Sequence, residues 1–122
     1  MTKVGEHITL DIIGTTKEYD PFVFEKVIND IAKAAKVTIL NISKYKFEPQ
    51  GFTILALLAE SHISFHTFPE KGIISFDFFT CGKISPSVAI DIVKKEFKHK
   101  RIVKKEFSRA VSYTHLTLPT KA

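Results

Sequence analysis

The sequence contains no tryptophan, a single cysteine and no long uninterrupted apolar segment. One cysteine cannot form an internal disulfide, and a lone thiol is typical of a protein in a reducing cytoplasm. Without a long apolar run, no transmembrane helix is expected. The first residues, MTKVGEHITL, also lack the basic-then-apolar layout of a signal peptide. These absences favour a cytoplasmic protein with no membrane partner.

Acidic residues are outnumbered by basic ones, which gives a formal net charge of +5. Much of this charge lies in one run, KKEFKHKRIVKK, at residues 94–105. Such a run is common in nucleic-acid-binding proteins. Here it is not interleaved with the exposed aromatics on which single-strand binders stack bases. We therefore interpret it as a solvated helix end that leads into an edge strand, and we expect no nucleic-acid partner.

A chain of 122 residues is long enough for one domain, which we place at residues 1–110. A core of this size is small, so pairing with a second copy would add stability. The last residues, VSYTHLTLPTKA, have no clear period and a sudden rise in threonine. They resemble a translated sequencing adapter, so we interpret residues 111–122 as a non-native tail; an ordinary C-terminal extension is the alternative.

Hydrophobic periodicity predicts an alternation of strands and helices along the chain. Asp20 and Pro21 are typical of a helix start, and apolar residues then recur at helical spacing up to residue 36. A second helix is expected to begin at Ser85-Pro86. The segment 52–59 is nearly all apolar, which is typical of a central strand buried on both faces. Strands are expected at residues 5–14, 37–47, 52–59, 61–68, 73–80 and 101–107.

This order of elements predicts an α+β fold, a two-layer sandwich with a mostly antiparallel sheet and two helices on one face. The opposite face of the sheet must be polar or covered. The sequence has 11 Phe, many of them in the predicted strands. We therefore expect a homodimer, or a dimer of cleaved alpha and beta chains, in which a second copy covers that face.

Two short segments combine residues that carry chemistry, ESHISFHTFPE at 60–70 and FTCG at 79–82. The Glu60-Ser61 bond lies at a junction between two predicted strands. A serine hydroxyl can attack the carbonyl before it, and β-elimination of the resulting ester leaves a group that hydrolyses to pyruvoyl. This reaction needs a strained peptide, a base and an oxyanion donor. His66 is a suitable proton carrier. Taken alone, however, Ser61 and His66 would be an ordinary strand serine and a half-buried histidine.

The two segments together resemble the short prokaryotic S-adenosylmethionine decarboxylases, which are made as self-cleaving proenzymes. Their pattern is similar to E-S-H-x-x-x-H-T-W-P-E followed by F-T-C-G, and the resemblance extends over about residues 5–109. It implies cleavage into chains 1–60 and 61–122, with a covalent pyruvoyl group formed from Ser61 and no metal. The pyruvoyl ketone would form a Schiff base with the substrate amine and accept the electrons released as carbon dioxide leaves.

The resemblance also implies roles for further residues. Cys81 would donate the proton in decarboxylation, although an isolated cysteine is more often a small buried hydrophobe. Phe47 would stack on the adenine of the substrate, and Glu70 would bind a ribose or a cationic group unless it is a simple turn residue. Thr53 falls where the family usually has a serine that assists processing. It keeps the hydroxyl but adds a methyl group, which bears on the rate of self-cleavage.

Three functions are compatible with these patterns. The first is decarboxylation of S-adenosylmethionine, a small-molecule substrate, for polyamine (spermidine) synthesis. The second is decarboxylation of arginine or ornithine on the same fold. The third is a small basic binding module without catalysis, which would not cleave itself.

Overall fold

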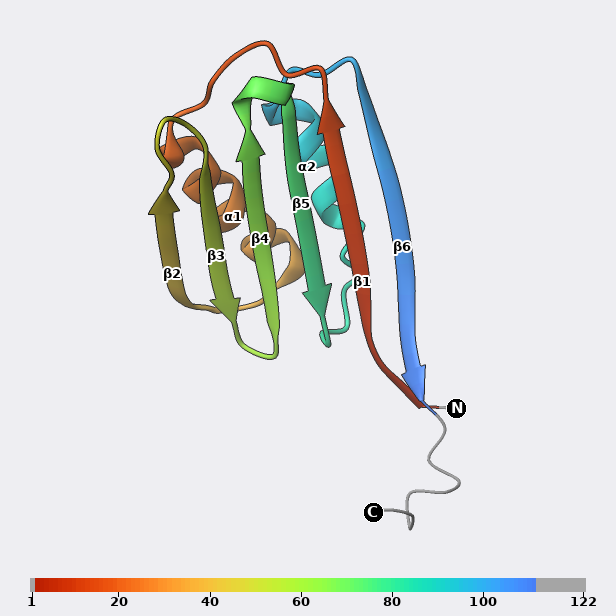
Figure 1. Cartoon of the computed structure of the whole chain (residues 1–122). Helices are drawn as coiled ribbons and strands as arrows, with labels where there is room; N and C mark the ends of the chain where they lie inside the picture. Colours follow the sequence, from red (N-terminus) through yellow and green to blue (C-terminus); the bar gives the residue numbers. More distant parts are fainter. Residues whose placement is uncertain (1, 112–122) are drawn as a thin grey trace, which may run out of the picture.

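Six strands form one sheet in the order β2-β3-β4-β5-β1-β6, and every neighbouring pair is antiparallel (Figure 1). The structure, a computed structural model, describes residues 2–111. The predicted tail therefore lies outside the described residues, apart from the backbone of Val111. The elements are β1 (Thr2–Ile13), α1 (Pro21–Ala35), β2 (Ile39–Lys46), β3 (Phe52–Leu58), β4 (Ser61–Phe68), the 3-10 turn η1 (Pro69–Lys71), β5 (Ile73–Thr80), α2 (Val88–Glu96) and β6 (Arg101–Val111).

Both helices pack on the same face of the sheet, as predicted (Figure 1). Helix α1 begins where expected, because the Asp20 side chain accepts a hydrogen bond of 2.9 Å from the Phe22 N–H and Pro21 needs no such partner. The helix ends at Ala35 and is capped by Lys36, which has a left-handed backbone and donates its N–H to the carbonyls of Ala32 and Lys33. The predicted apolar stripe of α1 is buried, at Phe24, Val27, Ile28, Ile31 and Ala35.

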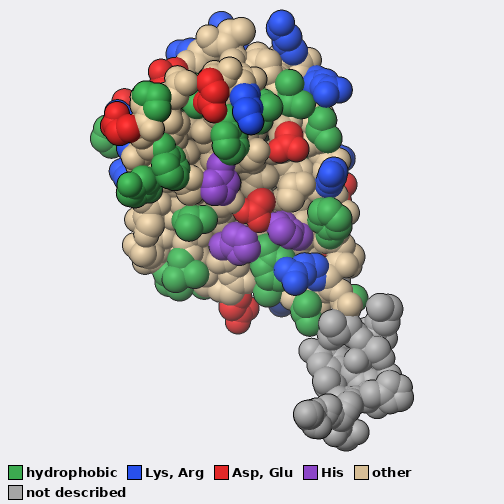
Figure 2. Space-filling view, in the orientation of Figure 1, with side chains coloured by type: hydrophobic (Ala, Val, Ile, Leu, Met, Phe, Trp, Pro, Cys, Tyr) green, Lys and Arg blue, Asp and Glu red, His purple; other side chains and the backbone are tan. Residues whose placement is uncertain are grey.

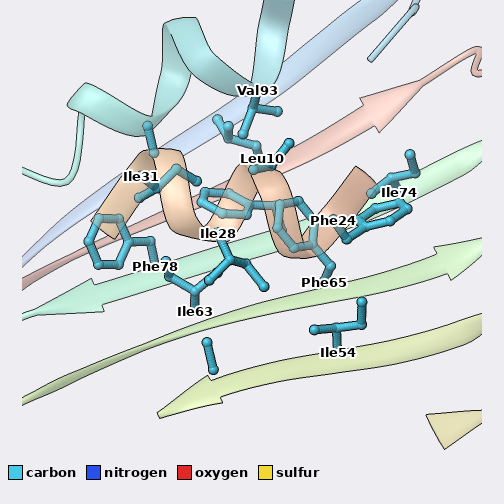
Figure 3. Close-up of a cluster of buried hydrophobic side chains, with 14 of the residues drawn as sticks. Leu10, Phe24, Ile28, Ile31, Ile54, Ile63, Phe65, Ile74, Phe78 and Val93 are labelled. Atoms are coloured by element: carbon cyan, nitrogen blue, oxygen red, sulfur yellow. The ribbon is translucent and has the colours of Figure 1, made fainter. Parts of the chain in front are cut away.

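The core lies between the helices and alternate residues of the strands (Figure 3). Phe24 of α1 is fully buried, and its ring meets those of Phe52, Phe65 and Phe97 at centroid distances of 4.9, 5.1 and 4.9 Å. Burying each such phenylalanine stabilises the fold by about 2–3 kcal/mol. This packing holds β3 and β4 rigidly against α1, and these two strands carry most of the predicted site.

Two local expectations are wrong. Helix α2 begins at Val88 rather than at Ser85-Pro86, because the Ser85 hydroxyl accepts from the Ser87 N–H and holds this segment in a turn before the helix. Strand β3 is not buried on both faces in the single chain. Its side chains alternate, and Leu55 and Leu57 are 48% and 55% exposed because both helices of residues 2–111 lie on the other side of the sheet.

The face of the sheet opposite the helices is polar at its centre and apolar at its margins. Histidine and acidic side chains gather in the middle of this face, as Figure 2 shows. We call it the open face. Its exposed apolar side chains include Leu55, Leu57 and Phe107. The basic run ends α2 and enters the edge strand β6, as predicted. Neither helix within residues 2–111 is long and apolar enough to span a membrane.

Candidate active site

The Glu60-Ser61 bond lies in the tight turn that joins β3 to β4, because Leu58 pairs directly with Ser61 across the hairpin. Glu60 has a φ of 62°, in the left-handed region. A residue with a Cβ atom is disfavoured there by roughly 1–2 kcal/mol. The Glu60-Ser61 peptide bond therefore follows a strained residue. The Ser61 side chain is buried, and its hydroxyl lies 3.4 Å from the Ala59 carbonyl oxygen.

Cys81 lies beside this turn, because Thr80 at the end of β5 pairs with Ser61. The Cys81 backbone N–H donates to the Glu60 carbonyl oxygen at 3.3 Å. The chain then bends sharply, with the Gly82 N–H donating to the Thr80 hydroxyl at 2.9 Å. The thiol of Cys81 is exposed. The geometry thus places a backbone N–H on the Glu60 carbonyl and a thiol next to Ser61.

A second group of predicted residues lies toward the other end of β4. Thr53 faces His66 across the β3–β4 ladder, and its hydroxyl is 2.8 Å from His66 Nδ1. This contact orients the imidazole and leaves Nε2 for proton transfer. Thr53 and His66 line an open depression of about 560 Å³ together with Phe47 and Glu70. The ring of Phe47 is 47% exposed, so a flat ligand could lie against it.

The two groups are not in contact within one chain. Ser61 and His66 are five residues apart on the extended strand β4, which separates them by roughly 16 Å. Their side chains also alternate to opposite faces, with His66 on the open face. The structure therefore brings Glu60, Ser61 and Cys81 together at one end, and Phe47, Thr53, His66 and Glu70 together at the other.

A polar cluster on the open face has no counterpart among the residues predicted from the sequence. His7 and His62 lie 2.6 and 3.2 Å from Asp77 Oδ1, and Ser64 donates to the other carboxylate oxygen. Burial alone would raise the pKa of the Asp77 carboxyl, but the hydrogen bonds from Ser64 and His7 and the nearby His62 hold the pKa below its usual value. The alternation of residues 73–80 places Asp77 on the polar side, but no sequence pattern connects it to His7.

Comparison with known proteins agrees with this geometry. The model of the S-adenosylmethionine decarboxylase family matches residues 6–110. The S-adenosylmethionine decarboxylase proenzyme of Prochlorococcus marinus is 41% identical over 109 residues, covering 87% of each chain. The proenzyme of Methanococcus maripaludis is 37% identical over 114 residues, covering 91% of this chain and 93% of that one.

A solved structure extends the similarity to the fold. The crystal structure of the adenosylmethionine decarboxylase from Aquifex aeolicus superposes with a TM-score of 0.79 at 32% identity. The superposition covers 92% of this chain and 95% of the other. With the family model matched over nearly all described residues, the chain belongs to the S-adenosylmethionine decarboxylase family.

Proposed function

We propose that the chain is a proenzyme that cuts itself between Glu60 and Ser61, and that the resulting pyruvoyl enzyme decarboxylates S-adenosylmethionine for polyamine synthesis. One observation carries the proposal. The carbonyl of the left-handed Glu60 accepts a hydrogen bond from the Cys81 N–H immediately before a serine. An acyl shift needs a strained peptide, an oxyanion donor and a nucleophile. All three therefore lie at one peptide bond.

In the first step Ser61 Oγ attacks the Glu60 carbonyl carbon, and the charge on the oxygen is stabilised by the Cys81 N–H. The C–N bond then breaks as the nitrogen takes a proton, which leaves an ester between Glu60 and the Ser61 side chain. Removal of the Ser61 Cα proton expels the Glu60 carboxylate. The dehydroalanine so formed tautomerises to an imine, and water releases ammonia to leave the pyruvoyl group at the start of β4.

The proton carrier for this reaction comes, in our proposal, from a second copy of the chain. His66 is oriented by Thr53 but lies roughly 16 Å from Ser61 of its own chain. It points out from the open face, which also exposes Leu55 and Leu57. A homodimer packed through its open faces would bury these leucines and carry His66 of one copy toward the β3–β4 turn of the other, where the Glu60-Ser61 peptide bond lies at the end of the sheet, although the Ser61 side chain itself lies on the helix side.

After cleavage, the pyruvoyl group supplies a carbonyl that withdraws electrons from the bond to the departing carbon dioxide. Cys81 directly follows Thr80, the register partner of Ser61, and its exposed thiol supports a role as the group that protonates the substrate carbon. Phe47 offers a flat ring to an adenine, a contact worth about 1 kcal/mol. Glu70 on the same depression offers a carboxylate to a ribose hydroxyl or to the sulfonium charge.

Intact-mass spectrometry and a denaturing gel test the cleavage. Purified protein should give chains 1–60 and 61–122, the second blocked to N-terminal sequencing. Ser61→Ala should remain whole, since it has no nucleophile. A wild-type chain that stays uncut and yet decarboxylates would contradict the proposal.

Co-expression tests the shared site. Ser61→Ala lacks the nucleophile, and His66→Ala lacks the proton carrier, so neither should cleave alone. In mixed dimers, Ser61 of the His66→Ala chain meets an intact His66 on its partner and should be cut. If mixing restores no cleavage of the His66→Ala chain while mixed dimers form, the two residues do not act across the dimer.

Release of carbon dioxide from three substrates identifies the substrate. Processed enzyme should decarboxylate S-adenosylmethionine and leave arginine and ornithine unchanged, because these two amino acids offer no adenine to Phe47. Turnover of arginine or ornithine with none of S-adenosylmethionine would replace this assignment.

A further inference from the structure

Three metal-binding side chains converge at the centre of the open face. His7 from β1, His62 from β4 and Asp77 from β5 place one donor atom each within 4.8 Å of one another. His7 and His62 both pair in register with Phe79, which lies between them. Asp77 lies two residues before Phe79, so its carboxylate meets both imidazoles diagonally.

The rings and the carboxylate are held in place by their neighbours. Phe79 packs on His7 and His62 at centroid distances of 5.9 and 6.0 Å. Ser64 fixes the second oxygen of the Asp77 carboxylate through a hydrogen bond. His7, His62 and Asp77 are all half-buried. Fixed rings and an oriented carboxylate are the surroundings that protein metal ligands usually have.

We propose that His7, His62 and Asp77 form a binding site for a divalent transition-metal ion such as Zn²⁺. Two imidazole nitrogens and one carboxylate oxygen are a common donor set for zinc and for non-haem iron, with bonds of about 2.0–2.2 Å. Donor atoms this close together can all reach one ion after small side-chain rotations. Mg²⁺ and Ca²⁺ prefer sites made of oxygen atoms, so this donor set disfavours them.

The family resemblance implied no metal, and no local pattern reveals this donor set, because the three ligands come from strands that are separated by up to 70 residues in the sequence. The ligands also come from the two proposed cleavage products. His7 belongs to residues 1–60, whereas His62 and Asp77 belong to residues 61–122. The ion would therefore connect the two chains after cleavage, next to the pyruvoyl group. This consequence rests on the proposed function, but ion binding itself does not.

Calorimetric titration of chelator-treated, full-length Ser61→Ala with Zn²⁺ tests the site on uncut chain. One ion should bind per chain. His7→Gln and Asp77→Asn, which keep the approximate shape of the side chains, should weaken binding at least about 100-fold. Ser64→Ala should weaken it about 10–100-fold, because the carboxylate loses its orienting partner. His99→Gln is the matched control, since His99 contacts the Phe97 carbonyl and lies outside the cluster.

The absorption spectrum of the Co²⁺ form identifies the ligands. Nitrogen and oxygen ligation without a thiolate charge-transfer band is expected, and a thiolate band would place the ion on Cys81 and overturn the proposal. Equal affinity of His7→Gln and His99→Gln would also overturn it, as would a complete absence of binding. Thermal melting of each variant verifies that it is folded. Because the titration uses uncut chain, a failure of self-cleavage leaves this result unaffected.

Discussion

The two ends of β4 prepare the same proposed reaction by different means. At the Ser61 end the relevant groups belong to the backbone: they are the left-handed Glu60 and the N–H of Cys81. At the His66 end they are side chains, a Thr53–His66 pair beside an open depression. The backbone features form when the β3–β4 hairpin folds. The side chains at the His66 end need, in our proposal, a second copy of the chain to complete the site. Under the proposed function, folding strains the Glu60-Ser61 bond, and assembly would supply the proton carrier.

The two faces of the sheet also differ in how far a single chain covers them. The helix-covered face carries fully buried side chains such as Phe65 and Phe78, which pack with Phe24 of α1 in one core. The open face holds buried and half-buried polar groups next to exposed leucines. A face that combines polar chemistry with exposed apolar area is typical of an interface that carries a site. This contrast is the basis for expecting activity from a dimer.

Removal of the imidazole at the His66 end should have the largest effect. His66→Ala should slow self-cleavage by about 10²–10⁴-fold, the usual contribution of a general acid or base. Thr53→Val, which removes the orienting hydroxyl but keeps the shape, should slow it less, and Thr53→Ser should preserve it. The cut fraction is measured by intact mass against time after synthesis. Cleavage of His66→Ala at the wild-type rate would remove His66 from the reaction.

Substitution of the thiol at the Ser61 end should separate the two activities. Cys81→Ala keeps the backbone N–H that contacts the Glu60 carbonyl, so self-cleavage should proceed. Carbon dioxide release should fall by about 10²-fold, because the proton donor for turnover is lost. Cleavage and carbon dioxide release are assayed on the same sample. Full turnover by processed Cys81→Ala would make the thiol a packing group only.

Local patterns were sufficient to predict most of the fold. The Asp20-Pro21 start, the stripe of α1 and the bounds of β4 and β5 follow from capping and periodicity, which depend on neighbours in sequence. The buried character of β3 was predicted wrongly for one chain, because exposure of Leu55 and Leu57 depends on what covers the sheet. That information is not local.

The residues of the candidate site also divide into those that local sequence patterns predict and those that they do not. The positions of Ser61, Cys81 and the open-face histidine His66 follow from strand register and alternation. That Ser61 and His66 are far apart within one chain also follows from alternation and strand length, once the strand is assigned. The cluster of His7 with Asp77 depends on β1 lying beside β5, a pairing between the first strand and a later one. Pairing over such separations requires a three-dimensional structure.

A smaller effect is expected at the substrate depression. Phe47→Ala should raise the Michaelis constant for S-adenosylmethionine about fivefold, which corresponds to a stacking contact of about 1 kcal/mol. Self-cleavage should be unchanged, because Phe47 does not contact the Ser61 turn. The control is Phe22→Ala, an equally large change on α1 where the ring is 75% exposed. Equal Michaelis constants for both variants would mean that the adenine does not lie on Phe47.

The smallest effect concerns the strain at Glu60, which Glu60→Gly should relieve. Glycine adopts a φ of 62° without the cost of roughly 1–2 kcal/mol that a Cβ atom imposes, although it adds about 0.5–1 kcal/mol of unfolded-state entropy. In the uncut Ser61→Ala background, the free energy of unfolding should therefore rise by at most about 1.5 kcal/mol. In the cleavable chain, the same relief should slow cutting up to about fivefold, because less strain is released when the peptide becomes an ester.

Ala59→Gly is the control, since it adds the same unfolded-state entropy at the other residue of the turn, where φ is not positive. Urea unfolding and the time course of cleavage measure the two quantities. If both glycine variants lower stability equally and cut at the same rate, the left-handed residue stores no strain that the reaction uses.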